Sequence, residues 1–101
     1  MTSSESDKSS GRRVKVCIAG RVQGVGYRYS TIQKAISLGL SGWVRNLTNG
    51  DVEAVFQGEP ETVDHMIEWC RKGPAFAKVR SVDVTDEDLL PGDRQPFEVR
   101  H

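Results

Sequence analysis

Hydrophobic residues first recur at every second position of the chain and then change to a helical period. Val14, Val16 and Ile18 alternate with less apolar neighbours, which is the pattern of a strand with one buried face. Apolar residues at helical spacing follow at Tyr29, Ile32, Ala35, Ile36 and Leu40. Gly39 suits the left-handed position that ends many helices. The pattern predicts a strand, a loop and a helix, in that order.

Two more segments rich in β-formers follow, at residues 42–47 and 51–57. Asn49-Gly50 lies between them and is a strong signal for a tight hairpin turn. Apolar residues occur at both odd and even positions in these segments. The pattern therefore predicts a hairpin but leaves its register open.

A second helix is expected from about Pro60, because the fixed φ of proline suits the first helical position, to Gly73-Pro74. Its apolar face contains Val63, Met66, Ile67 and Cys70. Residues 78–85 read as a fourth strand and residues 96–101 as a short edge strand. Between these strands lies an acidic connector, residues 86–93, whose Leu89-Leu90 pair is expected to cover the core.

The order β-α-β-β-α-β, with a short C-terminal edge strand, predicts an α+β fold of the ferredoxin-like split βαβ plan. Two helices would cover one face of an antiparallel sheet. In this plan the first and second strands run parallel with the third between them, so their C-terminal ends meet at one edge. Loop 21–27 is therefore expected beside Asn46.

Charge and composition limit the possible partners. The 101 residues include 14 basic and 14 acidic side chains, so the chain has no net positive field for nucleic acid or an anionic membrane. No apolar run approaches membrane-spanning length, and the start lacks a secretory signal, so a cytoplasmic location is expected. Residues 1–11 are Ser-rich and charged, which predicts a disordered tail before one domain at residues 12–101. Cys17 and Cys70 are expected to be reduced thiols.

The candidate chemistry lies in the run GRVQGVGYR at residues 20–28, between the first strand and the first helix. Glycines let the backbone approach a ligand, and the free N–H groups of the loop and helix start favour an anion. Arg28 adds a planar cation suited to phosphate oxygens. A basic residue in the first turn opposes the helix dipole, which favours an anionic partner over a solvated surface role. The run therefore predicts a phosphoryl cradle.

Other phosphate-handling and metal motifs do not match. The run lacks the Gly-Lys pair of a nucleotide P-loop, and Gly24-Val25-Gly26 lacks the third glycine of a dinucleotide fingerprint. Cys17 precedes the loop, whereas a thiol phosphatase needs its cysteine inside it. His65 and His101 form no cluster with metal-ligand spacing.

The run at 20–28, together with GWVRN at residues 42–46 and the following Asn49-Gly50, resembles the acylphosphatase family from about Val14 to the C-terminus. Tyr27 stands where the family typically has phenylalanine. The resemblance implies hydrolysis of acyl phosphates to a carboxylate and inorganic phosphate, without a metal, cofactor or phosphoenzyme. It makes residues 12–101 an acylphosphatase-like domain, and the small-molecule acyl phosphate its partner.

The resemblance also implies roles for individual residues. Arg28 would bind the phosphate and Asn46 would position the attacking water, although asparagine is also common at the start of turns. The rest of the predicted phosphate-binding set is Gln23, Gly24, Val25, Gly26 and Tyr27, of which Tyr27 is expected mainly to pack under the loop. Inorganic phosphate or sulfate would be a product-like ligand, and the chain is expected to be a monomer.

Two alternatives remain at this stage. The fold also hosts noncatalytic phosphate- or anion-binding regulatory modules. A related enzymatic alternative is the acylphosphatase-like domain of a larger carbamoyl-transfer protein, which we expect less because this chain ends with the domain. Trp43, Trp69 and Tyr29 are expected at the core or its edge rather than as a platform for bases. Arg21 and Arg45 are expected at the surface.

Overall fold

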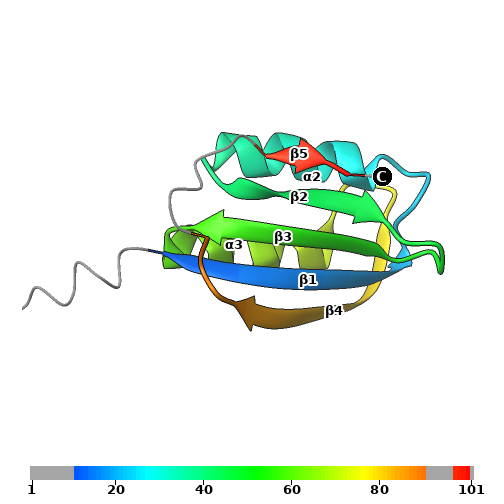
Figure 1. Cartoon of the computed structure of the whole chain (residues 1–101). Coiled ribbons are helices and arrows are strands. Elements are labelled where there is room, and N and C mark those ends of the chain that lie inside the picture. Colours follow the sequence, from blue (N-terminus) through cyan, green and yellow to red (C-terminus); the bar gives the residue numbers. More distant parts are fainter. Residues whose placement is uncertain (1–10, 91–96, 101) are drawn as a thin grey trace, which may run out of the picture.

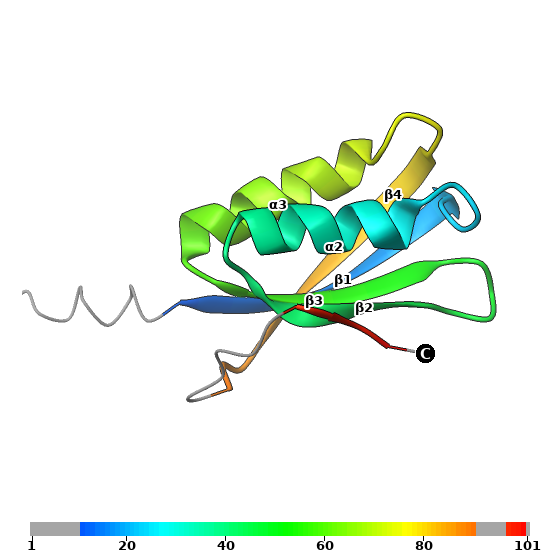
Figure 2. The same cartoon turned by 90° about the horizontal axis from the view of Figure 1, so that it is seen from above.

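The computed structural model describes residues 11–90 and 97–100, so most of the predicted tail and part of the acidic connector lie outside the described residues. The elements in chain order are β1 (Arg12–Arg21), α2 (Tyr27–Ser37), β2 (Ser41–Asn46), β3 (Val52–Gly58), α3 (Pro60–Lys72), β4 (Lys78–Glu87) and β5 (Glu98–Val99). The strands form one sheet in the order β4-β1-β3-β2-β5. Both helices cover the same face of it (Figures 1 and 2). The ferredoxin-like α+β prediction is confirmed.

The sheet is mixed rather than wholly antiparallel. β1 and β2 each pair antiparallel with β3, so they run parallel to each other with β3 between them, as predicted. The short β5, however, pairs parallel with β2. The reason is topological: β4 ends at the end of the sheet where β2 begins, so a strand that enters beside β2 from there must run in the same direction.

The core lies between the sheet and the helices, and strand alternation decides which side chains enter it. Val14, Val16 and Ile18 of β1 are all fully buried on the helix-covered face. Their cross-strand partners are Phe56, Ala54 and Val52 of β3. From α3 the predicted set Val63, Met66, Ile67 and Cys70 is buried, which confirms the helical face read from the sequence.

The buried face of α2 differs from the prediction. The helix begins at Tyr27 and buries Tyr27, Thr31 and Ala35, whereas Tyr29 is 68% exposed and Ile36 is 54% exposed. The buried residues are four positions apart and so lie on one face of the helix. A search for apolar residues misses this face because Thr31 is polar. Burial of Thr31 is tolerated because its Oγ1 donates to the Tyr27 carbonyl at 2.7 Å. The expectation that Tyr29 lies at the core or its edge was wrong.

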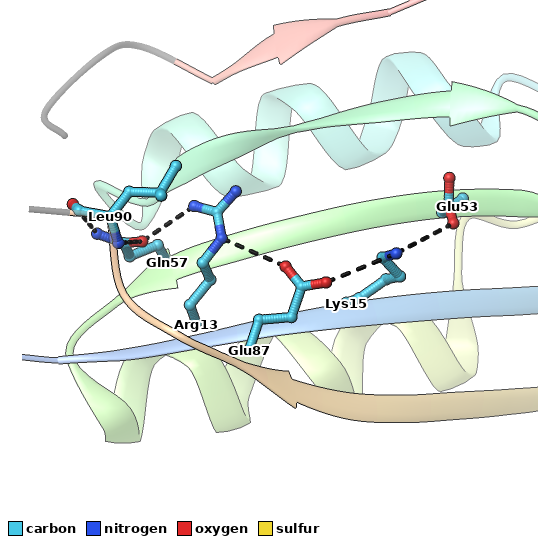
Figure 3. Close-up of polar contacts among 6 residues, drawn as sticks. All are labelled: Arg13, Lys15, Glu53, Gln57, Glu87 and Leu90. Atoms are coloured by element: carbon cyan, nitrogen blue, oxygen red, sulfur yellow. Dashed lines mark hydrogen bonds and ion pairs between the residues drawn. The ribbon is translucent and has the colours of Figure 1, made fainter.

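The face of the sheet opposite the helices holds a network of polar side chains (Figure 3). Glu87 accepts from Arg13 at 3.4 Å and from Lys15 at 3.5 Å, and Lys15 also lies 4.0 Å from Glu53. Arg13 donates further to Gln57 at 3.0 Å. These contacts connect β4, β1 and β3 across their exposed side.

Leu90 belongs to the edge of this polar face and not to the core. It is 48% exposed, so the expectation that the Leu89-Leu90 pair covers the core was wrong for Leu90. Its backbone N–H donates to Gln57 Oε1 at 3.2 Å, and its carbonyl accepts from Gln57 Nε2 at 3.3 Å (Figure 3). These two bonds hold the backbone of the connector against β3 and leave the leucine side chain outside.

Candidate functional site

The loop between β1 and α2 has a backbone that depends on glycine. Gly24 and Gly26 have φ of 78° and 80°, in the left-handed region, although a Cβ at either position would meet nothing within 4 Å. What glycine provides at both positions is therefore backbone conformation and not space. Gly26 is also the N-cap of α2, and it supplies no side-chain cap.

The start of α2 is suited to an anion. Its first turn contains no acidic residue, and the first N–H groups of any α-helix lack an intrahelical acceptor. Together with the positive end of the helix dipole, these groups favour a negatively charged ligand. Arg28 is the second residue of the helix and is half-buried. Within the described part of the chain its guanidinium has no hydrogen-bond or ion-pair partner, so its donors are available to a ligand.

Asn46 is the last residue of β2 and is exposed. Val44, two positions earlier, is fully buried under the helices. Because side chains alternate along a strand, Asn46 lies on this same helix-covered side, just beyond the core. Arg45 lies on the opposite side, where it donates to Glu53 at 2.6 Å. The register thus places the amide of Asn46 and not the guanidinium of Arg45 on the side where α2 begins.

The side chain of Gln23 joins the loop to the strand end that carries Asn46. Its Nε2 donates to the carbonyls of Leu47 and Asp51, at 2.8 Å each. These two residues close the β2–β3 hairpin, since the Leu47 N–H donates to the Asp51 carbonyl at 2.8 Å. The loop, the start of α2 and the hairpin accordingly gather at one end of the sheet (Figures 1 and 2).

The hairpin was predicted from Asn49-Gly50. Its loop has three residues, one more than the common two-residue hairpin loop. The Gly50 N–H donates to the Leu47 carbonyl at 3.1 Å, and Gly50 has φ of 98°. This combination is a type I turn followed by a glycine at positive φ, a common three-residue hairpin loop. Its consequence for the site is that the Leu47 and Asp51 carbonyls point toward Gln23.

Tyr27 is buried against α3, and its phenol has a partner there. The side chain is 1% exposed, and its hydroxyl donates to the Cys70 carbonyl at 2.7 Å. That carbonyl lacks a helical donor, because residue 74 is proline and the Gly73 N–H donates instead to the Trp69 carbonyl at 2.7 Å. Burial is the main reason that the pKa of the Tyr27 phenol is raised well above its usual range.

The cysteines are free thiols and do not belong to the loop. Burial, followed by the negative charge of Asp51 at 3.7 Å, raises the pKa of the half-buried Cys17. Burial also raises the pKa of Cys70, to about 12. Neither thiol is activated as a nucleophile, since that requires a lowered pKa.

The described residues contain no cluster of three or more His, Cys, Asp or Glu side chains that could hold a metal ion. None of the described helices has the length and apolar character needed to cross a bilayer.

Comparison with known proteins gives a consistent result. The family model for acylphosphatase matches residues 14–99. An acylphosphatase from Rubrobacter xylanophilus is 53% identical over 89 residues, which cover 88% of this chain and 80% of that protein. One from Acaryochloris marina is 56% identical over 86 residues, or 85% of this chain and 90% of that protein. The solved structure of an acylphosphatase from Coxiella burnetii superposes with a TM-score of 0.81 at 39% identity, covering 89% of this chain and 93% of that one.

Proposed function

This chain belongs to the acylphosphatase family and hydrolyses acyl phosphates, and we propose that it does so by direct attack of water on phosphorus. In this mechanism Arg28 and the N–H groups of residues 23–27 hold the phosphoryl group, and Asn46 positions the water. The products are a carboxylate and inorganic phosphate.

The observation that carries the proposal is the pair of hydrogen bonds from the Gln23 side chain to the Leu47 and Asp51 carbonyls. They tie the anion-binding loop to the residue directly after Asn46. Arg28 then lies at the other end of the same loop, in the first turn of α2. The proposed phosphate donors and the proposed water-positioning amide are thus held at one end of the sheet.

The chemistry needs little more than this. The leaving group is a carboxylate whose conjugate acid has a pKa of about 4, so it departs without a general acid. The transferred group passes through a loose transition state with charge on its equatorial oxygens, which Arg28 and the loop amides would stabilise. Asn46 can accept a hydrogen bond from the water and donate another, which aligns the nucleophile. We propose that the substrate phosphate itself accepts the proton.

The proposal extends to the setting of the enzyme. We propose a cytoplasmic monomer that acts on small acyl phosphates and binds inorganic phosphate or sulfate as product-like ligands. The zero net charge of the chain supports recognition by local donors and not by a broad positive field. Sedimentation equilibrium with and without phosphate measures the oligomeric state directly.

The test compares catalysis with phosphate binding in benzoyl phosphate assays that contain EDTA. Arg28→Ala should weaken inhibition by inorganic phosphate at least tenfold, because it removes a charged donor from the anion. Asn46→Ala should lower kcat by about 100-fold or more while phosphate inhibition stays within about twofold. Arg71→Ala, which removes an exposed arginine that pairs with Glu68 at 3.4 Å, is the matched control and should change neither quantity.

Three results would contradict the mechanism. Loss of wild-type activity in EDTA would require a metal, and a trapped labelled phosphoenzyme would rule out direct attack by water. If the protein binds phosphate tightly but leaves benzoyl phosphate unhydrolysed, it is a noncatalytic anion-binding module.

A further inference from the structure

The loop between α3 and β4, residues 73–77, lies against both ends of the proposed phosphate-binding loop. At one end, a Cβ built on Gly73 would stand 2.8 Å from Cε2 of the Tyr27 ring. At the other end, Lys78 is the cross-strand partner of Arg21. The two loops lie at the same end of the sheet in both views (Figures 1 and 2).

The contact between β1 and β4 is very close at the point where the phosphate-binding loop begins and the α3–β4 loop ends. The register of the pair shifts between Ala19 and Gly20. A Cβ built on Gly20 would stand 2.2 Å from the Lys78 carbonyl oxygen, so only glycine permits this approach. The first residue of β4, and with it the end of the α3–β4 loop, is held directly beside the start of the phosphate-binding loop.

Phe76 is the outermost large side chain of this loop. It is 80% exposed, while the next residue, Ala77, packs against the core. The Ala77 N–H donates to the Pro74 carbonyl at 3.0 Å, which closes a turn with Phe76 at its second central position. A single exposed apolar residue is ordinary on a protein surface. This one differs because its loop is anchored at both ends to the elements that would bind the phosphate.

We propose that Phe76 forms a subsite for the acyl group of the substrate and favours aromatic over small aliphatic acyl phosphates. The inference rests on the proposed function, because it requires a phosphoryl group held by Arg28 and the adjoining loop. Asn46 would hold the attacking water on the β2 side of the site, so an acyl group that departs in line leaves on the opposite side of phosphorus, toward β1 and β4. A phenyl ring on the neighbouring loop offers it an apolar and aromatic contact.

The experiment measures kcat/KM for benzoyl phosphate and for acetyl phosphate in the full chain. Phe76→Ala should lower the ratio of the two values about three- to tenfold, with acetyl phosphate hydrolysis unchanged within about twofold. Phe76→Trp should keep the wild-type ratio, since it restores an aromatic face. Tyr29→Ala is the matched control, because it removes another exposed aromatic residue, from α2, and should leave the ratio unchanged.

The outcomes separate this inference from the proposed function. If Phe76→Ala changes both substrates equally or changes neither, the subsite is wrong and the hydrolytic mechanism stands. The subsite is equally wrong if Tyr29→Ala lowers the ratio as much as Phe76→Ala does. If the wild-type chain hydrolyses neither substrate, the proposed function and the subsite are overturned together.

Discussion

Replacing Tyr27 by phenylalanine, the residue that the family typically has here, should destabilise this particular chain. The ring would stay in its buried position beside Trp69, whose ring centroid lies 5.7 Å away. Only the hydroxyl that donates to the Cys70 carbonyl at 2.7 Å would be lost. With Pro74 downstream, that carbonyl has no helical N–H donor to replace it.

The size of the effect follows from this missing partner. Cys70 is fully buried, so water cannot freely take the place of the phenol. An unsatisfied buried acceptor costs about 1–3 kcal/mol, and we expect a loss in that range in the free energy of unfolding near pH 7. Tyr29→Phe removes a phenol from a tyrosine that is 68% exposed and should change the same quantity by less than about 0.5 kcal/mol.

The pH dependence gives an independent check of the same bond. The phenol of an unfolded chain titrates near about pH 10. Burial raises the pKa of Tyr27 in the folded protein above this value, so at higher pH the unfolded state loses a proton that the folded state keeps. The tyrosine's contribution to stability is therefore complete below about pH 10 and is lost as the pH rises, at about 1.4 kcal/mol per pH unit. The difference between wild type and Tyr27→Phe should close within about 1–2 pH units above 10.

Urea unfolding followed by tryptophan fluorescence, at pH 7 and at several values from 9.5 to 11.5, measures both quantities. Equal stability of the two proteins at pH 7 would show that the phenol bond contributes nothing. A difference that stays constant above pH 10 would show instead that the tyrosine is not held protonated by burial.

Three further substitutions test other contacts. Gly20→Ala should lower the free energy of unfolding by about 2–4 kcal/mol in urea titrations, because its Cβ would stand 2.2 Å from the Lys78 carbonyl oxygen and its φ is 130°. Gln23→Ala should lower kcat/KM about tenfold in a benzoyl phosphate assay, since it removes both 2.8 Å bonds that join the loop to the hairpin, and an unchanged value would separate those bonds from catalysis. Glu53→Gln should cost about 0.5–1.5 kcal/mol of stability in urea titrations without changing kcat/KM, because it weakens the 2.6 Å pair with the partly exposed Arg45 on the opposite face of the sheet.

Features that depend on neighbouring residues could be predicted from the sequence. Gly39, with φ of 72°, follows the end of α2, and Pro60 begins α3, because glycine and proline act on their own backbone dihedrals. The hairpin at Asn49-Gly50 was likewise predictable, since its turn chemistry is local. The split βαβ topology could be predicted from the order of these elements, because the rules for connecting strands and helices allow only a few arrangements of that order.

Features that depend on distant partners could not be predicted in this way. Gln23 and its acceptors Leu47 and Asp51 are separated by 24 and 28 residues, and no local pattern links them. The buried face of α2 was misread because Thr31 is polar by type but satisfies its hydroxyl within the helix. The parallel pairing of β5 depended on which sheet edge the chain reaches after β4, and the sequence pattern does not carry that information.

The topology explains why a short loop and one amide can be brought together at all. β1 and β2 run parallel, so the segments that follow them leave the sheet at the same end. β3 separates the two strands, and a gap of two strand spacings, about 10 Å, lies between their ends. The loop beyond β1 enters this gap, and the side chain of Gln23 closes its last part by binding the first carbonyl beyond β2 and the last one before β3. A shorter residue at position 23 would leave the same fold with its phosphate donors and its amide unconnected, so the length of this side chain links the topology to the proposed chemistry.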